Sequence, residues 1–210
     1  MGLPLGAPEC PTAFAARAEL PCENCDTGHA LATRDLVCRD FRDALGSFAT
    51  GVTVLTTLAA DGKPIGVTIS SFNSVSLDPP LVLWSLSAAS PRLEAFRRAS
   101  RYAVNVLAAD QQWISDRFAS REDDRFDGLA TSQGLGDVPL IEGCSAWFEC
   151  ATHAQHPGGD HLLFLGRVLR FARGEGREPL IFHGGGYREL RGRPEGESTE
   201  LRKSSPSPQR

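Results

Sequence analysis

The sequence lacks the features of a membrane-spanning, secreted or nucleic-acid-binding protein. No apolar run approaches the roughly 20 residues that a membrane-spanning helix needs. The first positive side chain is Arg17, and no apolar signal stretch follows it. The 22 basic and 26 acidic residues give a net charge of −4, so there is no basic surplus to attract nucleic acid or an acidic membrane. We therefore expect a cytoplasmic protein that binds neither nucleic acid nor a membrane.

Phosphate-binding signatures are also missing. No GxGxxG motif follows a predicted strand and no P-loop motif occurs, so Rossmann and NTPase folds have no support. The glycine run 184–186 indicates only a turn. The class of protein must therefore be sought among folds that use neither motif.

Cysteine gives little evidence of a metal site. Cys22 and Cys25 form a single CxxC pair, and Cys10 and Cys38 lie at loose spacing on either side. A structural zinc site usually has a second ligand pair at tight spacing, so incidental thiols in an extended arm are favoured over a zinc knuckle. The remaining pair, 144 and 150, flanks a predicted strand and is expected to be structural.

Composition divides the chain into three parts. Residues 1–31 are rich in Ala, Pro and Gly without apolar periodicity and predict a disordered arm. Charged, Ser and Pro residues dominate 191–210 and predict a disordered tail. Residues 32–190 are long enough for one domain with a full core.

The central domain is predicted to be mainly β. Strands are expected at 52–58, 64–69, 81–86, 102–107, 146–153, 162–169 and 179–183, and helices at about 33–47, 91–98 and 111–118. The strand 81–86 is apolar enough to be buried on both faces, and Ser90 is the expected N-cap of a helix that starts at Pro91. Residues 119–139 read as a polar loop of functional or dimer-contacting type. Without a βαβ rhythm, these elements favour an antiparallel barrel with helical inserts.

The most informative stretch is 66–80. It begins as a strand and becomes a hydroxyl-rich connection that Pro79 and Pro80 end, because proline has no N–H for a ladder. Five hydroxyls fall between Thr68 and Ser76. Such a surface suits a ligand that needs many directional hydrogen bonds and little charge, as the edge of a flavin ring does. A surface edge strand with a serine-rich loop is the competing interpretation.

The order of these segments resembles the flavin reductase-like family, the FMN-binding split barrels that serve as small partners of two-component monooxygenases. The most specific piece is the run Thr-x-Ser-Ser-Phe-x-Ser-Val-Ser-Leu-x-Pro-Pro, and the match covers roughly residues 38–190. The segments that carry the resemblance are 49–57, 61–62, 66–80, 104–107, 159–161 and 179–182. It implies an antiparallel split β-barrel with short peripheral helices, and a homodimer whose second chain helps to close the site.

The resemblance also implies which residues hold the flavin, either FMN or FAD. The implied cofactor-binding residues are Thr50, Gly51, Val52, Thr68, Ile69, Ser70, Ser71, Ser74, Val75, Ser76, Ser87, Ser90, Arg92 and Tyr187. Gly51 allows close backbone approach to the ring, which a Cβ would block. N–H groups and hydroxyls aimed at O2, O4 and N5 would favour the anionic reduced flavin.

A phosphate is expected near Ser87, Ser90 and Arg92, at a predicted helix N-terminus where free N–H groups and the helix dipole favour anions. The alternative is that Ser90 only caps the helix and Arg92 is a solvated surface charge.

By the same resemblance, His161 is the expected catalytic side chain, orienting the nicotinamide or moving a proton. Tyr187 and His183 are secondary candidates. Metal binding by His153, His156 and His161 finds no supporting carboxylate or Cys pattern, so no metal is expected.

The predicted function is that of an NAD(P)H-dependent flavin reductase. Hydride would pass from NADH or NADPH to flavin N5, and the reduced flavin would go to a partner monooxygenase or halogenase. Two alternatives stay open. One is a split-barrel oxidase or monooxygenase that retains FMN and acts on a small organic substrate, and the other is a non-enzymatic flavin- or haem-binding module.

Overall fold

A computed structural model of the chain describes residues 31–121 and 124–190. The chain divides into two compact units, Met1–Phe48 and Ala49–Arg210, which are described separately. The predicted disordered tail, the predicted arm up to residue 30 and the CxxC pair all lie outside the described residues. The three-part division of the chain therefore stays a prediction.

The first unit contributes one described helix, α1 (Leu31–Gly46), close to the predicted 33–47. Phe41 and Leu45 of this helix and Phe48 just after it are exposed. Burial of these three side chains therefore does not stabilise α1, although packing of an apolar face is the usual source of helix stability.

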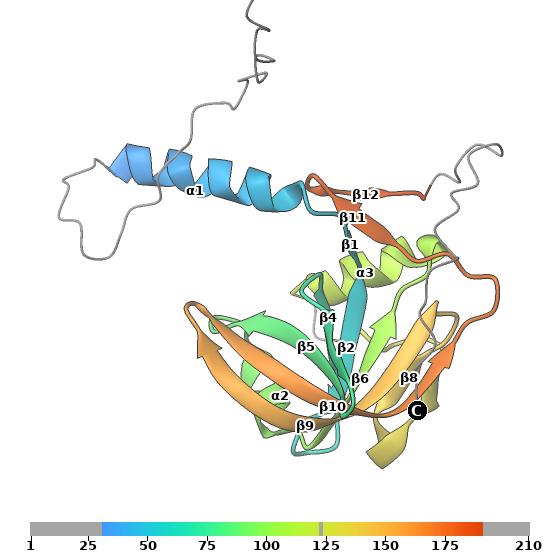
Figure 1. Cartoon of the computed structure of the whole chain (residues 1–210). Helices are drawn as coiled ribbons and strands as arrows, with labels where there is room; N and C mark the ends of the chain where they lie inside the picture. The colour runs from blue at the N-terminus through green and yellow to red at the C-terminus, as the bar shows by residue number, and fades with distance from the viewer. Residues whose placement is uncertain (1–30, 122–123, 191–210) are drawn as a thin grey trace, which may run out of the picture. The chain divides into compact units, whose positions relative to one another are not determined.

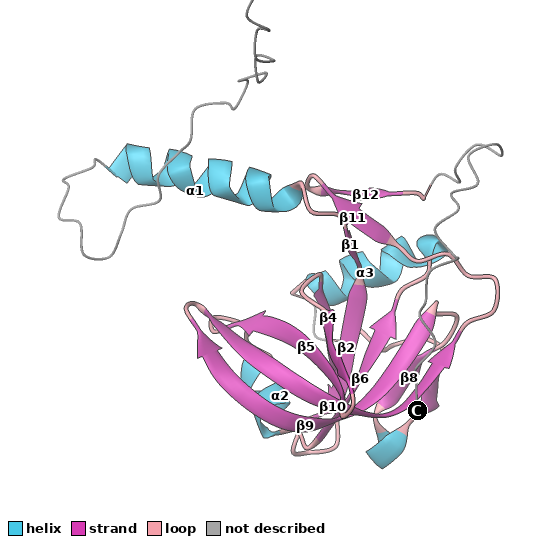
Figure 2. Cartoon of the chain, in the orientation of Figure 1, coloured by secondary structure: helices cyan, strands magenta, loops and turns pink. Residues whose placement is uncertain are grey.

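The second unit is built on one antiparallel sheet of seven strands, in the order β3-β2-β6-β9-β10-β5-β4 (Figures 1 and 2). Its strands are β2 (Thr53–Leu58), β3 (Pro64–Ile69), β4 (Asn73–Leu77), β5 (Pro80–Ser87), β6 (Arg101–Val106), β9 (Ala146–Gly158) and β10 (His161–Arg173). Figure 1 shows β9 and β10 as a long curved hairpin, with β5 beside β10. The predicted mainly β, antiparallel architecture is confirmed.

Two small sheets and four short helical segments complete this unit. The small sheets join β1 (Thr50–Gly51), β11 (Ile181–His183) and β12 (Gly186–Arg188), and β7 (Thr131–Gln133) with β8 (Pro139–Ile141). The α-helices are α2 (Leu93–Arg98) and α3 (Gln112–Ala119), and the 3₁₀ turns are η1 (Ala109–Gln111) and η2 (Leu135–Asp137). Among the described residues, no helix combines the length and apolar character needed to cross a membrane.

Trp84 of β5 organises the first of two cores. Its ring stacks on Phe164 of β10 at 4.0 Å between centroids and 4° between planes. Phe96 and Tyr102 meet the same indole edge-on, at 5.3 and 5.4 Å. All four rings are at most 1% exposed, so they form the interior of the curled sheet.

The second core lies on the other face of β2. There Ile114 and Phe118 of α3 pack in one buried cluster with Val52 and Val54, whereas Leu55 belongs to the core around Trp84. Because β2 is covered on both faces, its threonines must bond internally. Thr56 Oγ1 donates to the Pro139 carbonyl oxygen at 2.6 Å, and Asn105 Nδ2 donates to the Val54 carbonyl oxygen at 2.9 Å.

Three sequence predictions about the strands and loops were wrong in detail. Residues 73–77 form strand β4, paired with β5, and not a connection. In β5, Val82, Trp84 and Leu86 are buried but the alternate side chains are partly exposed, because only one face of the strand packs in the core. The predicted loop 119–139 contains β7 and η2.

The start of α2 also differs from the prediction. The helix begins at Leu93, and the residue before it, Arg92, makes no side-chain cap. Ser90 is not the N-cap; its Oγ accepts the Arg92 N–H at 3.3 Å, and its carbonyl oxygen accepts the Leu93 N–H at 3.1 Å. Hydroxyl bonds to a backbone N–H two residues ahead are typical of Ser-led turns. Ser90 therefore shapes the turn that leads into α2.

Candidate active site

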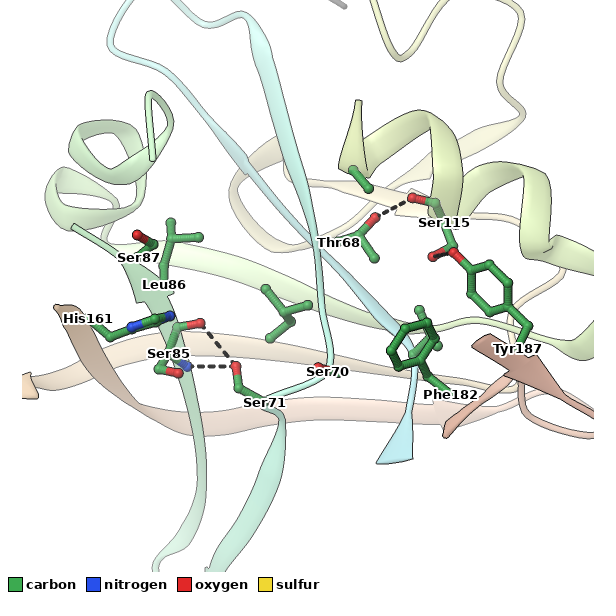
Figure 3. A pocket seen from close by; sticks show the side chains of 13 residues that line it. Thr68, Ser70, Ser71, Ser85, Leu86, Ser87, Ser115, His161, Phe182 and Tyr187 are labelled. Atoms are coloured by element: carbon green, nitrogen blue, oxygen red, sulfur yellow. Dashed lines mark hydrogen bonds between the residues drawn. The ribbon is translucent and has the colours of Figure 1, made fainter. Parts of the chain in front are cut away.

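A cleft of ≈ 430 Å³ in the second unit is lined by thirteen residues (Figure 3). Its floor consists of Val52, Thr68, Ile69, Ser70 and Ser71. One side, the strand wall, consists of Ser85, Leu86, Ser87 and His161 from β5 and β10; the other, the helix wall, consists of Ser115, Ala119, Phe182 and Tyr187 from α3, β11 and β12. No Asp, Glu, Lys or Arg is among these described lining residues.

The strand wall is positioned by backbone pairing. His161 is the first residue of β10 and stands opposite Ser87 of β5. The hairpin before it turns through Gly159, whose φ of 67° suits the left-handed backbone that tight turns need. His161 is therefore placed at the rim of the cleft by the register of two strands.

His161 also has a bonded neighbour. Its Nδ1 lies 2.7 Å from Asp160 Oδ1, and this hydrogen bond, together with the imidazole's charge, lowers the pKa of the Asp160 carboxyl. With Nδ1 engaged, Nε2 is the ring nitrogen left to meet a ligand. The His161 side chain is 43% exposed, so a ligand can reach it.

Ser71 connects the floor to the strand wall. Its Oγ donates to the Ser85 carbonyl oxygen and accepts the Ser85 N–H, both at 3.0 Å (Figure 3). This pair of bonds takes the place of a ladder pair between the end of β3 and β5. The hydroxyl proton of Ser71 is used in the bond to Ser85. Its Oγ can therefore only accept a hydrogen bond from a ligand.

Three further hydroxyl contacts hold the helix wall. Thr68 Oγ1 donates to the Ser115 carbonyl oxygen at 2.7 Å (Figure 3). The Tyr187 hydroxyl oxygen lies 2.8 Å from Ser115 Oγ and 2.8 Å from Asp116 Oδ1. A carboxylate only accepts, so the single phenol proton goes to Asp116, and Ser115 donates its own proton to Tyr187.

The phenol of Tyr187 stays protonated over a wide pH range. Burial is the main cause of its raised pKa, and the Asp116 carboxylate adds to it while Ser115 acts in the opposite direction. The Phe182 ring meets the Tyr187 ring edge-on, with centroids 5.5 Å apart. Aromatic surface and a neutral phenol therefore border the cleft on this side.

The structure brings together eight of the fifteen residues that the sequence placed in the site. They are Val52, Thr68, Ile69, Ser70, Ser71, Ser87, His161 and Tyr187. They come from the segments 50–52, 66–80, 87, 161 and 187, which are far apart in the chain. Their roles toward a cofactor stay predictions.

The other seven do not line the cleft. Thr50 and Gly51 lie just before it in β1, and a Cβ on Gly51 would meet no atom within 4 Å. Among the described residues, therefore, no neighbouring atom requires a glycine at this position. The remaining residues are Ser74, Val75 and Ser76 on the edge strand β4, and Ser90 and Arg92 before α2.

Sequence reasoning missed five lining residues. They are Ser85, Leu86, Ser115, Ala119 and Phe182. Ser115 and Ala119 are small residues four apart on one face of a helix, a spacing visible in the sequence that shows a shared face but not what the face meets. Phe182 lies in a segment that carried the family resemblance without an assigned role.

No metal cluster occurs in the described ranges 31–121 and 124–190, where no three His, Cys, Asp or Glu side chains converge. The cleft thus has hydroxyls, apolar side chains and one imidazole as its chemical groups. Ligand sites of this size commonly combine apolar walls with a few placed polar groups.

A curled antiparallel sheet with a neutral, hydroxyl-lined cleft matches the split-barrel class that the sequence predicted. More particularly, the chain belongs to the flavin reductase-like family, because the sequence model described as "Flavin reductase like domain" matches residues 45–191. This confirms the resemblance seen in the sequence.

Characterised relatives and solved structures agree. FMN reductase (NADH) SmoA of Agrobacterium fabrum is 50% identical over 149 residues, covering 71% of this chain and 84% of that protein. The reductase component of flavin-dependent trigonelline monooxygenase of Acinetobacter baylyi is 45% identical over 71% of this chain, which spans about half (48%) of its length. NADH:FAD oxidoreductase SgcE6 of Streptomyces globisporus, solved with NAD and FAD fragments, is 37% identical, with a TM-score of 0.71 over 76% of this chain and 95% of that one. The predicted fold class is thereby confirmed.

Proposed function

We propose that this chain is the NADH-dependent flavin reductase of a two-component system, which passes reduced FMN or FAD to a partner monooxygenase or halogenase. The predicted enzyme class, an NAD(P)H:flavin oxidoreductase, is confirmed by relatives named FMN reductase (NADH) and NADH:FAD oxidoreductase. The observation that carries the proposal is the neutral, hydroxyl-lined cleft with His161 at its rim.

The described residues fit a flavin ring. Ser70, Ser85 and Ser87 offer hydroxyls toward a ring edge, and the apolar Ile69 and Leu86 offer contact to a ring face. A cleft without charged lining suits a planar, uncharged heterocycle better than a carboxylate or a phosphate. When bound, the flavin supplies the hydride-accepting chemistry.

The protein's own part is placement. The two walls would hold the flavin and nicotinamide rings side by side, at the spacing of about 3–3.5 Å that hydride transfer needs. His161 Nε2 would orient a nicotinamide amide or hold a proton at the rim, and the contact of Nδ1 with Asp160 supports this role. The serine hydroxyls and nearby backbone N–H groups favour negative charge on the ring.

The direct test is to purify the full chain, record its visible spectrum and measure NADH oxidation with FMN, FAD and riboflavin. We expect oxidation that depends on added flavin. Flavin retained through turnover with a small organic co-substrate would favour the oxidase or monooxygenase alternative. Absence of NADH oxidation with every flavin would overturn the proposal in favour of a binding module.

A flavin phosphate is proposed to bind near Ser90 and Arg92. Because α2 starts only at Leu93 and has six residues, the guanidinium and not a helix dipole carries this proposal. Arg92 lines a hollow of ≈ 260 Å³ beside Pro91.

The test is the double variant Ser90→Ala, Arg92→Ala. Its affinity for FMN should fall roughly ten- to a hundredfold, while its affinity for riboflavin, which has no phosphate, should change little. Equal weakening of both flavins would remove the two residues from the phosphate site.

A homodimer is proposed on the evidence of β4. This strand is an outer edge of the seven-stranded sheet, and its Val75 and Leu77 are 51% and 95% exposed. An exposed apolar edge is a surface that proteins usually cover. A second copy on this edge would bring Ser74 and Ser76, which do not reach the cleft of their own chain, toward a shared site.

Leu77→Asp should convert a dimer to a monomer in light scattering and weaken flavin binding at the same time. A wild-type chain that is already monomeric would overturn the homodimer without affecting the reductase assignment. The cytoplasmic location stays a prediction from the sequence.

A further inference from the structure

Arg125 is a buried cation outside the cleft. It is 4% exposed, and a buried guanidinium is stable only where acceptors surround it. Its Nη1 donates to the carbonyl oxygens of Gly66 and Phe118, each at 3.2 Å, and its Nη2 donates to the carbonyl oxygen of Ser120. One side chain therefore bonds to both β3 and α3.

The chemistry of these acceptors favours arginine. The Phe118 and Ser120 carbonyls belong to the C-terminal end of α3, where the last four carbonyls of a helix have no intrahelical partner and the dipole is negative. A planar guanidinium can donate in several fixed directions at once, which an ammonium does less well. Arg125 thus caps α3 while reaching across to Gly66.

The joint between α3 and β3 is closely packed. A Cβ on Gly66 would collide with the Phe118 ring, so the helix side chain lies directly on the strand backbone. Phe126 meets the Phe118 ring edge-on, with centroids 5.0 Å apart. The end of α3 is therefore held on β3 by one guanidinium and two aromatic rings.

The same two elements build the cleft. Residues 115 and 119 of α3 belong to the helix wall, residues 68 and 69 of β3 belong to the floor, and Arg125 itself lines neither. We propose that Arg125 is a positioning residue: its guanidinium sets the spacing between the helix wall and the floor, and thereby the fit of the flavin ring. This inference rests on the proposed function.

The experiment compares the full-length wild type with Arg125→Ala and Arg125→Lys, with Arg121→Ala as the matched control. Arg121 is an exposed arginine just after α3, so the control removes the same charge from the same segment. The readouts are the FMN dissociation constant from flavin fluorescence, KM for FMN and kcat at saturating FMN, with melting temperature alongside.

We expect Arg125→Ala to raise the FMN dissociation constant and KM together, roughly tenfold or more, with kcat within about twofold of the wild type. Arg125→Lys keeps the charge but loses the planar, multidirectional donors of the guanidinium. Its FMN dissociation constant and KM should therefore lie between those of the wild type and Arg125→Ala. Arg121→Ala should match the wild type. A merely structural role would lower the melting temperature without this split between KM and kcat.

Folded Arg125→Ala with a lower melting temperature but wild-type FMN affinity would overturn the inference. If Arg125→Ala does not fold, the same comparison is made with Arg125→Lys. An FMN affinity of Arg125→Lys equal to that of the wild type would then overturn the inference. Failure of the wild type itself to bind or reduce flavin is a different result, since it overturns the proposed function and the role of Arg125 with it.

Discussion

The two walls of the cleft are built by different kinds of bond. The strand wall follows from a continuous ladder between β5 and β10, which runs from His161 opposite Ser87 to Arg167 opposite Leu81. The α3 part of the helix wall depends on individual side chains, because Thr68 bonds to Ser115 and Arg125 bonds the end of α3. A ladder of backbone hydrogen bonds depends on many residues, whereas each of these side-chain bonds depends on a single side chain. Mutations should therefore damage the strand wall through its packing and the helix wall through single contacts.

The largest effect should come from removing the packing behind the strand wall. Trp84→Ala deletes a fully buried indole that stacks on Phe164 of the neighbouring strand. We expect a loss of about 3–5 kcal/mol in the free energy of unfolding, measured by chemical denaturation. Trp113→Ala, at a tryptophan that is 53% exposed, is the control and should cost much less. Equal losses would mean that the core around Trp84 does not support this wall.

The next effect concerns the helix wall. Gly66→Ala places a methyl group against the Phe118 ring and should cost about 1–3 kcal/mol of stability by overpacking. Gly51→Ala is the contrasting glycine, since its new methyl group meets no atom within 4 Å. It should leave the melting temperature unchanged but weaken flavin binding if a ring lies against Gly51. Unchanged flavin affinity would remove Gly51 from the binding site.

His161→Ala tests the strand wall without disturbing its ladder. We expect single-turnover flavin reduction to slow by roughly tenfold or more, because a small misplacement of the reacting rings is costly in rate. The flavin dissociation constant should change little. Anaerobic stopped-flow reduction at saturating flavin measures the rate, and a flavin titration measures the dissociation constant. An unchanged hydride-transfer rate would show that the imidazole takes no part in reduction.

The smallest effect is expected at the neighbour of His161. The lowered pKa of Asp160 keeps its carboxylate charged down through the pH range where a carboxyl usually becomes protonated, so its bond to His161 is present at neutral pH and is lost only as the pH falls through that lowered pKa. Asp160→Asn should slow reduction only about two- to fivefold, because the pair is exposed. The difference between variant and wild type should narrow as the pH falls. A constant difference at every pH would mean that the Asp160 charge does not act on His161.

The sequence was sufficient for the floor and for Ser87 and His161 of the strand wall, but of the helix wall it indicated only Tyr187. Alternating apolar residues and turn glycines indicate strands and hairpins, so the placement of His161 at the start of β10 could be foreseen. Nothing local in the sequence indicates that Ser115 and Ala119 face the cleft, because that depends on how Phe118 and Arg125 seat α3 on β3. Strand β4 was missed for a related reason. Its serines have low strand preference, and the strand forms because β5 offers a partner.

The register of β10 also constrains how this enzyme can change through evolution. The pairing that puts His161 opposite Ser87 also puts Phe164 opposite Trp84. Deleting one residue from the turn at Gly159 would therefore turn every following side chain of β10 to the other face, moving the imidazole away from the cleft and breaking the stacked core together. Lineages that keep a stable core thus inherit the position of the histidine with it. New substrate preferences are more accessible through the helix wall, where single replacements leave the ladder intact.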